Sequence, residues 1–198
     1  MKRMILIVSW MAVITLIGAI GIAQTVFTDV WKDKDYRGPV KKVAVFWILQ
    51  VPENRVLAES EFVRQLKARG VSAMPVYVVI PPDKFVERDA ALAKIRDLGA
   101  DVVLTLRLTD RLTVQSQIPQ AGPKDPTRLS GYYRNVYDAP TIGTSEPAYV
   151  ETNLFDVKTD KRIWTARSVT KVDVVDQKAL SDFIGIMIDR LVSDGMIP

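Results

Sequence analysis

The sequence contains no cysteine and no histidine. Without cysteine there is no thiol nucleophile, no disulfide and no c-type haem attachment, and without either residue there is no Cys/His zinc site. Histidine acid–base catalysis is excluded as well. The lack of cysteine does not locate the protein, because exported proteins of this size can fold without disulfides.

Several ligand-binding and catalytic motifs are also missing. The chain has no Gly-x-Gly-x-x-Gly sequence, no phosphate-binding P-loop and no Gly-x-Ser-x-Gly elbow. A calcium loop needs alternating oxygen ligands with a glycine and a distal glutamate, and no such run occurs. We therefore expect no cofactor and no metal.

The two signs of charge nearly balance, with 27 Lys and Arg against 23 Asp and Glu. The formal net charge is +4, and Lys2 and Arg3 at the start of the chain supply two of these charges. The remainder is too weakly basic for a nucleic-acid footprint, and no basic helix or aromatic-basic RNA motif is present. No nucleic-acid partner is expected.

What the chain does have is material for one core. It has 198 residues, of which 48% are hydrophobic and 25% charged. These values are typical of a single globular domain of ordinary size.

One long apolar run, residues 5–23, follows the basic pair at the N-terminus. As a helix it would span about 28 Å, close to the thickness of a bilayer core, which favours a retained membrane anchor. Gly21-Ile22-Ala23 is a small-x-small site, which favours a signal peptide cleaved before Gln24. The sequence leaves both alternatives open.

Both alternatives place residues 24–198 on the outer side of the inner membrane. Lys2 and Arg3 would stay inside under the positive-inside rule. We therefore expect the protein in the periplasm or on the periplasmic face of the inner membrane, with membrane contact through residues 5–23 if they are not cleaved.

After the N-terminus, strand-like and helix-like segments alternate. Runs rich in β-branched and aromatic residues are separated by segments with helical periodicity that end at Gly70 and Gly99. This β-α-β-α-β order predicts parallel strands joined by right-handed crossovers. The five segments are residues 41–49, 51–70, 71–80, 81–100 and 101–114.

Three further segments complete the expected fold. Residues 24–40 predict a short strand and a loop, residues 149–171 a β-hairpin, and residues 176–195 an amphipathic C-terminal helix. The sequence thus predicts an α/β protein, a two-layer or three-layer sandwich around one mixed sheet. The chain is thus divided into a signal peptide or membrane anchor at residues 1–23 and a single α/β domain at residues 24–198.

The helical segment at 51–70 shows an apolar face and a polar face. Glu59, Arg64 and Lys67 are expected to point away from the core. The expected core residues of this helix are Val56, Phe62, Val63 and Leu66.

Residues 119–147 differ in composition from the rest of the chain. They hold five of the eleven prolines and three of the six tyrosines, and predict a long loop. Tyr132, Tyr133, Arg134 and Tyr137 are candidate partner-binding residues, because Tyr and Arg are favoured at interaction hot spots. The alternative is a loop folded back so that its tyrosines cover the sheet.

Trp31 and Tyr36 in the segment before the first predicted crossover are the second candidate site. They could form a docking strip beside the membrane. The alternative is a charged turn in which Trp31 covers an edge of the core.

Acidic residues offer one catalytic alternative. Asp138, Glu146 and Glu151 flank the long loop, and a facing pair of carboxylates could hydrolyse a wall polymer. Asp156 and Asp160 are explained by the turn of the predicted hairpin without any chemistry.

Four stretches, in this order and spacing, resemble a family of uncharacterised bacterial cell-envelope proteins, most of them predicted lipoproteins. The stretches are VWKDKDYRGPVKKVAVF, EFVRQLKARGVSA, LGADVVLTLRL and ETNLFDVKTDKRIWTA. Members carry a Trp-Lys-Asp-x-x-Tyr motif (here Trp31 to Tyr36), a Gly-Ala-Asp motif (Gly99 to Asp101) and a Leu-Tyr/Phe-Asp-x-x-Thr…Trp hairpin (Leu154 to Trp164). The resemblance covers residues 28–198.

The resemblance implies an exported α/β domain with no known activity. The layout is also similar, more distantly, to outer-membrane lipoproteins that activate penicillin-binding proteins or build secretion channels, which is an analogy of fold. The lipid-bearing cysteine of the family is missing here. Anchoring by lipid is therefore not expected.

These observations favour an exported bacterial envelope protein that is not an enzyme. We expect a non-catalytic interaction module that binds an envelope protein partner, and the wall-polymer hydrolase is the alternative.

Overall fold

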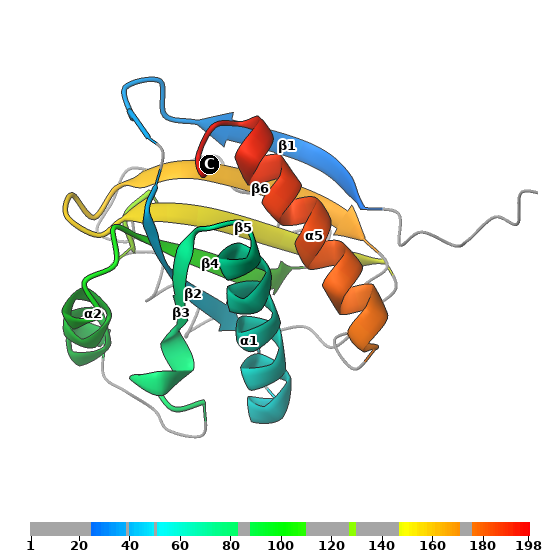
Figure 1. Ribbon diagram of the computed structural model, residues 1–198, viewed down its shortest axis with the longest axis horizontal. Helices are drawn as coiled ribbons and strands as arrows, with labels where there is room; N and C mark the ends of the chain where they lie inside the picture. The colour runs from blue at the N-terminus through cyan, green and yellow to red at the C-terminus, as the bar shows by residue number, and fades with distance from the viewer. Residues whose placement is uncertain are drawn as a thin grey trace, which may run out of the picture.

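The computed structural model describes residues 25–38, 40–49, 51–82, 88–109, 127–129, 147–170 and 176–198. They form one mixed six-stranded sheet in the order β1-β6-β5-β4-β2-β3 (Figure 1). The strands are β1 (Val26–Lys32), β2 (Lys42–Ile48), β3 (Ser72–Pro75), β4 (Val102–Thr109), β5 (Ala148–Asp156) and β6 (Arg162–Thr170).

The sheet has a parallel part and an antiparallel part. β2 is parallel to both β3 and β4, whereas the pairs β4–β5, β5–β6 and β6–β1 are antiparallel. Helix α1 (Pro52–Ala68) connects β2 to β3, and α2 (Arg88–Asp97) lies between β3 and β4 in the chain. Because these two connections run in opposite directions along the sheet, right-handed crossovers place their helices on opposite faces.

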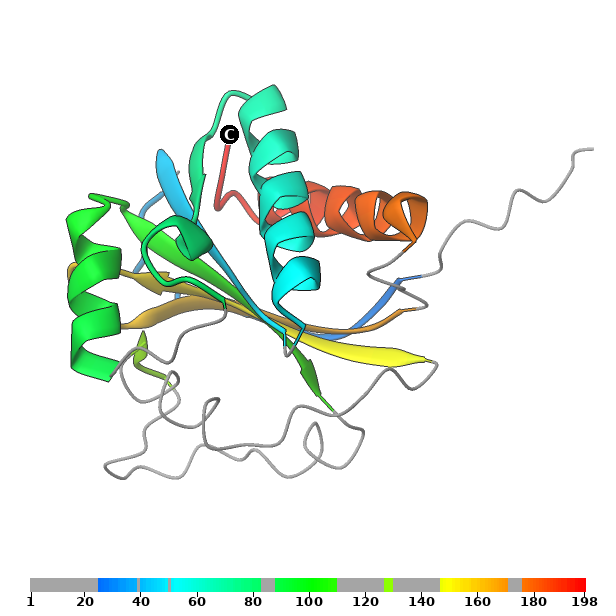
Figure 2. The same ribbon diagram turned by 90° about the horizontal axis from the view of Figure 1, so that it is seen from below.

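Two hydrophobic clusters lie on the two faces. The larger one joins β-strand residues such as Trp47 and Trp164 to α1 and to the C-terminal helix α5 (Gln177–Ser193). The smaller one joins Phe46 and Phe155 to α2. Figure 2 shows α1 and α5 together on one side of the sheet and α2 apart from them. The predicted α/β fold with one mixed sheet, a hairpin and a C-terminal helix is confirmed.

The strand predicted at 71–80 is wrong in its second half. It ends at Pro75, and residues Val76–Val78 form the 3₁₀ helix η1. Proline has no N–H to donate to a ladder, so β3 pairs with β2 only as far as Val45–Pro75. The end of β2 is therefore left without a neighbour on this side.

Glu59 fills that gap, which corrects the prediction that it points away from the core. It is fully buried, and its carboxylate accepts hydrogen bonds from the Trp47 N–H (3.1 Å) and the Tyr77 N–H (2.8 Å). Arg55, 4% exposed, donates from Nε at 2.7 Å. One carboxylate thus joins α1, β2 and η1 at the point where the sheet ladder stops.

Hairpin β5–β6 closes as the sequence predicts. Asp156 Oδ1 accepts hydrogen bonds from both the backbone N–H and the hydroxyl of Thr159, each at 2.6 Å. Asp160 takes a left-handed conformation with φ of 60°, which Asp tolerates better than most residues. The turn accounts for both acids without any catalytic role.

α5 is fixed at both ends. Asp176 caps its first turn by accepting from the N–H groups of Lys178 and Ala179. At the other end, the Asp194 carboxylate accepts from Trp164 Nε1 at 2.7 Å, and its carbonyl accepts from Lys32 Nζ at 2.7 Å. The helix is therefore held to β6 and β1. Of the helices in the described ranges, none is both long and apolar enough to span a bilayer.

Candidate functional site

The tyrosine-rich candidate, Tyr132, Tyr133, Arg134 and Tyr137, lies outside the described residues. Its role in partner binding stays a prediction. Asp138 and Glu146 of the hydrolase alternative also lie outside them.

Trp31 and Tyr36 are both described, and they do not form one site. Trp31 pairs with Thr165 across β1 and β6, is 46% exposed and has the Arg162 guanidinium 5.8 Å from its ring centre. Trp31 is therefore a partly exposed residue on an edge strand of the sheet. Tyr36 is half-buried and packs against the larger cluster, on the side where α1 and α5 lie. Burial raises the pKa of its hydroxyl, with smaller contributions from Asp156 and Asp101.

Glu151, the third acid of the hydrolase alternative, faces a cation. It lies on β5 opposite Arg107 on β4, and Arg107 Nη2 donates to Glu151 Oε2 at 2.9 Å. Both side chains are buried. Across the two strands, Glu151 therefore faces an arginine rather than a second acid.

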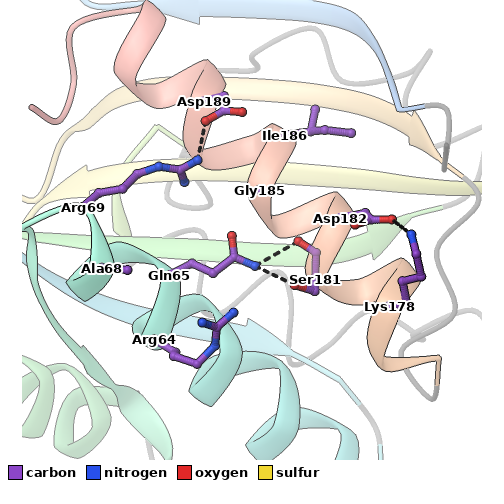
Figure 3. A pocket seen from close by; sticks show the side chains of 10 residues that line it. All are labelled: Arg64, Gln65, Ala68, Arg69, Lys178, Ser181, Asp182, Gly185, Ile186 and Asp189. Atoms are coloured by element: carbon purple, nitrogen blue, oxygen red, sulfur yellow. Dashed lines mark hydrogen bonds and ion pairs between the residues drawn. The ribbon is translucent and has the colours of Figure 1, made fainter.

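A surface hollow of about 630 Å³ lies in a groove between α1 and α5 (Figure 3). A second hollow of about 420 Å³ shares Arg64 and Ser181 with it and reaches toward Leu57 and Leu180. We call the two together the α1–α5 groove. The first hollow is lined by Arg64, Gln65, Ala68, Arg69, Lys178, Ser181, Asp182, Gly185, Ile186 and Asp189.

Small residues on both helices form the floor of the groove. Ala68 lies on α1 and Gly185 on α5, and a Cβ added at Gly185 would meet Gln65 Oε1 at 3.5 Å, an ordinary contact. The glycine is therefore not required by close packing within the chain. On a helical wheel Gly185 shares the polar side of α5 with Lys178 and Asp182, and this is the one feature of the sequence that indicates a hollow there.

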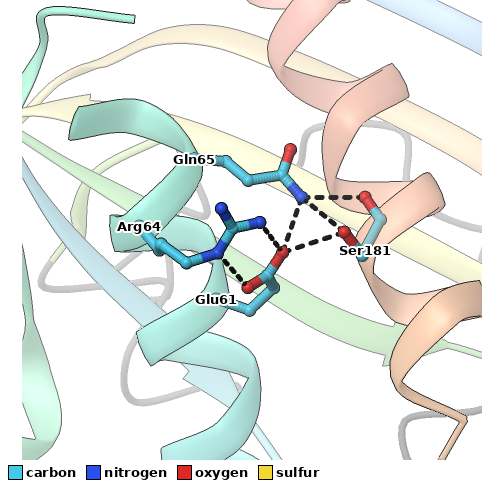
Figure 4. A network of polar contacts seen from close by, with 4 residues as sticks. All are labelled: Glu61, Arg64, Gln65 and Ser181. Atoms are coloured by element: carbon cyan, nitrogen blue, oxygen red, sulfur yellow. Dashed lines mark hydrogen bonds and ion pairs between the residues drawn. The ribbon is translucent and has the colours of Figure 1, made fainter. Parts of the chain in front are cut away.

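A polar network around Glu61 crosses the groove (Figure 4). The Glu61 carboxylate receives two bonds from Arg64, both at 2.7 Å, and single bonds from Gln65 Nε2 at 2.8 Å and the Ser181 hydroxyl at 2.9 Å. Gln65 also donates to the Ser181 carbonyl at 2.9 Å. The network therefore joins α1 to α5 through hydrogen bonds as well as through the apolar core.

These donors stabilise the charged form of Glu61. The hydrogen bond from Arg64 is the largest cause, and the pKa of the Glu61 carboxyl falls to about 2. The Ser181 hydroxyl donates a hydrogen bond to this carboxylate, and a carboxyl group with so low a pKa is a poor general base. The Glu61 carboxylate and the Ser181 hydroxyl thus form a bonded polar pair between α1 and α5.

The other charges of the groove are paired as well. Arg69 bonds to Asp189 across the two helices, and Lys178 donates to Asp182 at 2.6 Å along α5. Within the described ranges no three side chains of the types that ligate metals lie together. The groove thus offers balanced charge rather than a site for a small ion.

Stability should depend on Glu61 at acid pH. Because its folded pKa is lower than the usual value of 4.5, Glu61 stabilises the fold above pH 4.5, and this contribution is lost as the pH falls from about 4.5 to 2. Because the network is partly solvated, we expect this contribution to the free energy of unfolding to be about 1 kcal/mol. Urea unfolding of wild type and Glu61→Gln across this pH range tests the prediction. Equal pH dependence of the two proteins would contradict the role of Glu61.

No protein-family profile and no curated protein matches this chain. Among solved structures, the fold is similar to that of PelC from Paraburkholderia phytofirmans, a dodecamer. For one PelC structure the two sequences are 15% identical and the TM-score is 0.40. The match covers 80% of this chain and 96% of the PelC chain. A single-substitution variant of the same protein has the same identity and TM-score, with 81% and 93% covered.

Proposed function

We propose that the chain is an exported cell-envelope protein that acts as a non-catalytic interaction module, and that a protein partner binds in the α1–α5 groove. The proposal combines two parts that are tested separately, export and binding.

The state of the groove's charged groups carries the binding part. Glu61, Arg69 and Lys178 are each paired with an opposite charge, and the Glu61 carboxyl has a pKa of about 2. A hollow of this size with no group poised for proton transfer favours recognition over catalysis. A groove with charges of both signs and small residues at its floor suits a protein surface that also carries charges of both signs.

The export part rests on the N-terminal pattern. A basic pair followed by the apolar run at 5–23 is typical of a signal peptide or an inner-membrane anchor. The resemblance to envelope proteins over residues 28–198 supports the same location. The missing cysteine makes a lipid anchor an unsuitable alternative.

Intact mass measured on separated membrane and periplasmic fractions tests export. A periplasmic species beginning at Gln24 would show a cleaved signal peptide, and a full-length species in the inner membrane would show an anchor. Recovery of the protein only from the cytoplasm would overturn the export part.

Site-specific photo-crosslinking tests the groove. A photoreactive residue at Ala68, on the floor, should give a protein adduct in intact cells. The same residue at Lys67, exposed on the same helix but outside the groove lining, should give little. Equal yields at the two positions would show that the groove is not the binding surface.

A further inference from the structure

The two rims of the α1–α5 groove carry opposite charge. Arg64 and Arg69 project from α1, and Asp182 and Asp189 from α5 (Figure 3). The side chains of Arg64 and Asp189 are 64% and 69% exposed, although each has a partner within the chain. Both therefore retain solvated faces that can accept a second charged partner.

The two helices run in the same direction along the chain and cross at an angle (Figure 2). Glu61 contacts Ser181 and Arg69 contacts Asp189, so both contacts join residues 120 positions apart in the sequence. A residue on α1 therefore lies level with the α5 residue numbered 120 higher. Glu61 is close to the level of Lys178, Arg64 to that of Asp182, and Arg69 is level with Asp189.

We propose that the occupant of the groove is the same groove of a second copy of this chain, which forms a two-fold dimer whose axis bisects the directions of α1 and α5. Such an axis lays α1 of each copy over α5 of the other without changing the level of any residue. Glu61, Arg64 and Arg69 then face Lys178, Asp182 and Asp189 of the second copy. All three facing pairs are opposite in sign.

The charges also exclude the other face-to-face dimer. A two-fold axis across the helices would lay α1 over α1, and the arginines of one copy would face those of the other. Like charges brought together in this way cost several kcal/mol. The charge pattern therefore selects a single arrangement, which an isologous interface requires.

The size and floor of the surface suit a weak dimer. Each helix has 17 residues and is about 25 Å long, so the two helices present about 500 Å² per copy. The total of about 1,000 Å² is at the lower limit for a specific interface. Ala68 and Gly185 allow close approach, and Leu57 and Val192, 45% and 38% exposed, add apolar area on these helices.

Two charge-inverted variants of the full chain test the proposal. Arg64→Glu with Arg69→Glu makes both rims acidic, and Asp182→Lys with Asp189→Lys makes both rims basic. Native mass spectrometry and sedimentation at about 100 µM in mild detergent should show dimers for wild type. Each variant alone should dimerise at least 10-fold more weakly, and an equimolar mixture should recover the dimer as a mixed species.

The mixture is decisive because ion pairs within one chain cannot be restored by adding another chain. Lys67→Glu, on the same helix but outside the groove lining, is the matched control and should dimerise like wild type. A monomeric wild type, a dimer unaffected by either variant, or a mixture that stays monomeric would overturn the proposal.

This inference rests on the proposed interaction role of the groove, and the two can fail separately. If the chain is monomeric while a residue at Ala68 still crosslinks to a different protein, the dimer is wrong and the interaction role stands. If the crosslinks at positions 68 and 67 are equal and the mixed dimer is also absent, both are wrong.

Discussion

Replacing Glu59 with alanine should lower the free energy of unfolding by about 3–5 kcal/mol. The change leaves the Arg55 guanidinium buried without its carboxylate and removes the acceptor from the N–H groups of Trp47 and Tyr77. Burial raises the pKa of Glu59, and the Arg55 charge opposes this. The carboxylate is thus tolerated inside the protein only because of these partners.

Urea or thermal unfolding measures the effect. Glu53→Ala changes an exposed glutamate in the first turn of the same helix and should cost less than about 1 kcal/mol. The loss for Glu59→Gln should lie between those for Glu59→Ala and Glu53→Ala. The amide oxygen can still accept hydrogen bonds, but the charge of Arg55 is left unpaired. A loss below about 1 kcal/mol for Glu59→Ala would show that the end of β2 does not depend on this residue.

Replacing Trp47 with alanine should cost a similar amount, about 3–5 kcal/mol. Trp47 is fully buried on the face of β2 that carries α1 and α5. Its ring contacts Phe62 of α1 edge-on at 6.5 Å and Phe183 of α5 at 5.8 Å between ring centres. Removing it leaves a cavity where both helices meet the sheet.

Trp31→Ala is the matched control, since it deletes the same side chain at a position that is 46% exposed. It should cost less than about 1 kcal/mol. Comparable losses for the two variants would contradict the assignment of Trp47 to the core and Trp31 to the surface. Because Trp47 supports both walls of the α1–α5 groove, its alanine variant should also reduce crosslinking from Ala68.

The alternation of strands and helices could be predicted because it depends on short-range patterns. Continuous β-branched runs at 41–49 and helical periodicity ending at Gly70 and Gly99 identify elements one at a time. The same holds for the hairpin, whose turn residues are local. The early end of β3 at Pro75 and the 3₁₀ helix that follows it were not predicted.

Glu59 shows where such patterns fail. A helical wheel sorts residues by angle, and on that basis Glu59 belongs to the polar face. Glu59 is buried because the end of β2 has no neighbouring strand on one side. That gap exists only because a different element, β3, stops at Pro75. Because this gap arises from tertiary structure, the sequence around Glu59 does not indicate that Glu59 fills it.

The α1–α5 groove could not be predicted for the same reason. Its walls lie about 120 residues apart in the chain, and each helix alone shows only an ordinary charged surface. The low pKa of Glu61 depends on Arg64, on the same helix, and also on Ser181, which tertiary packing brings to it. The candidates chosen from the sequence, in contrast, were local clusters of Tyr, Trp and Arg.

By itself the sequence determined the excluded chemistry, the α/β class and the order of its elements, because residue types and their periodicity are properties of short segments. The tertiary structure alone decided which face of the sheet each helix covers, which acid is buried and which charges meet across α1 and α5. These depend on contacts between distant segments, whose free energies are set by the burial and partners that folding creates.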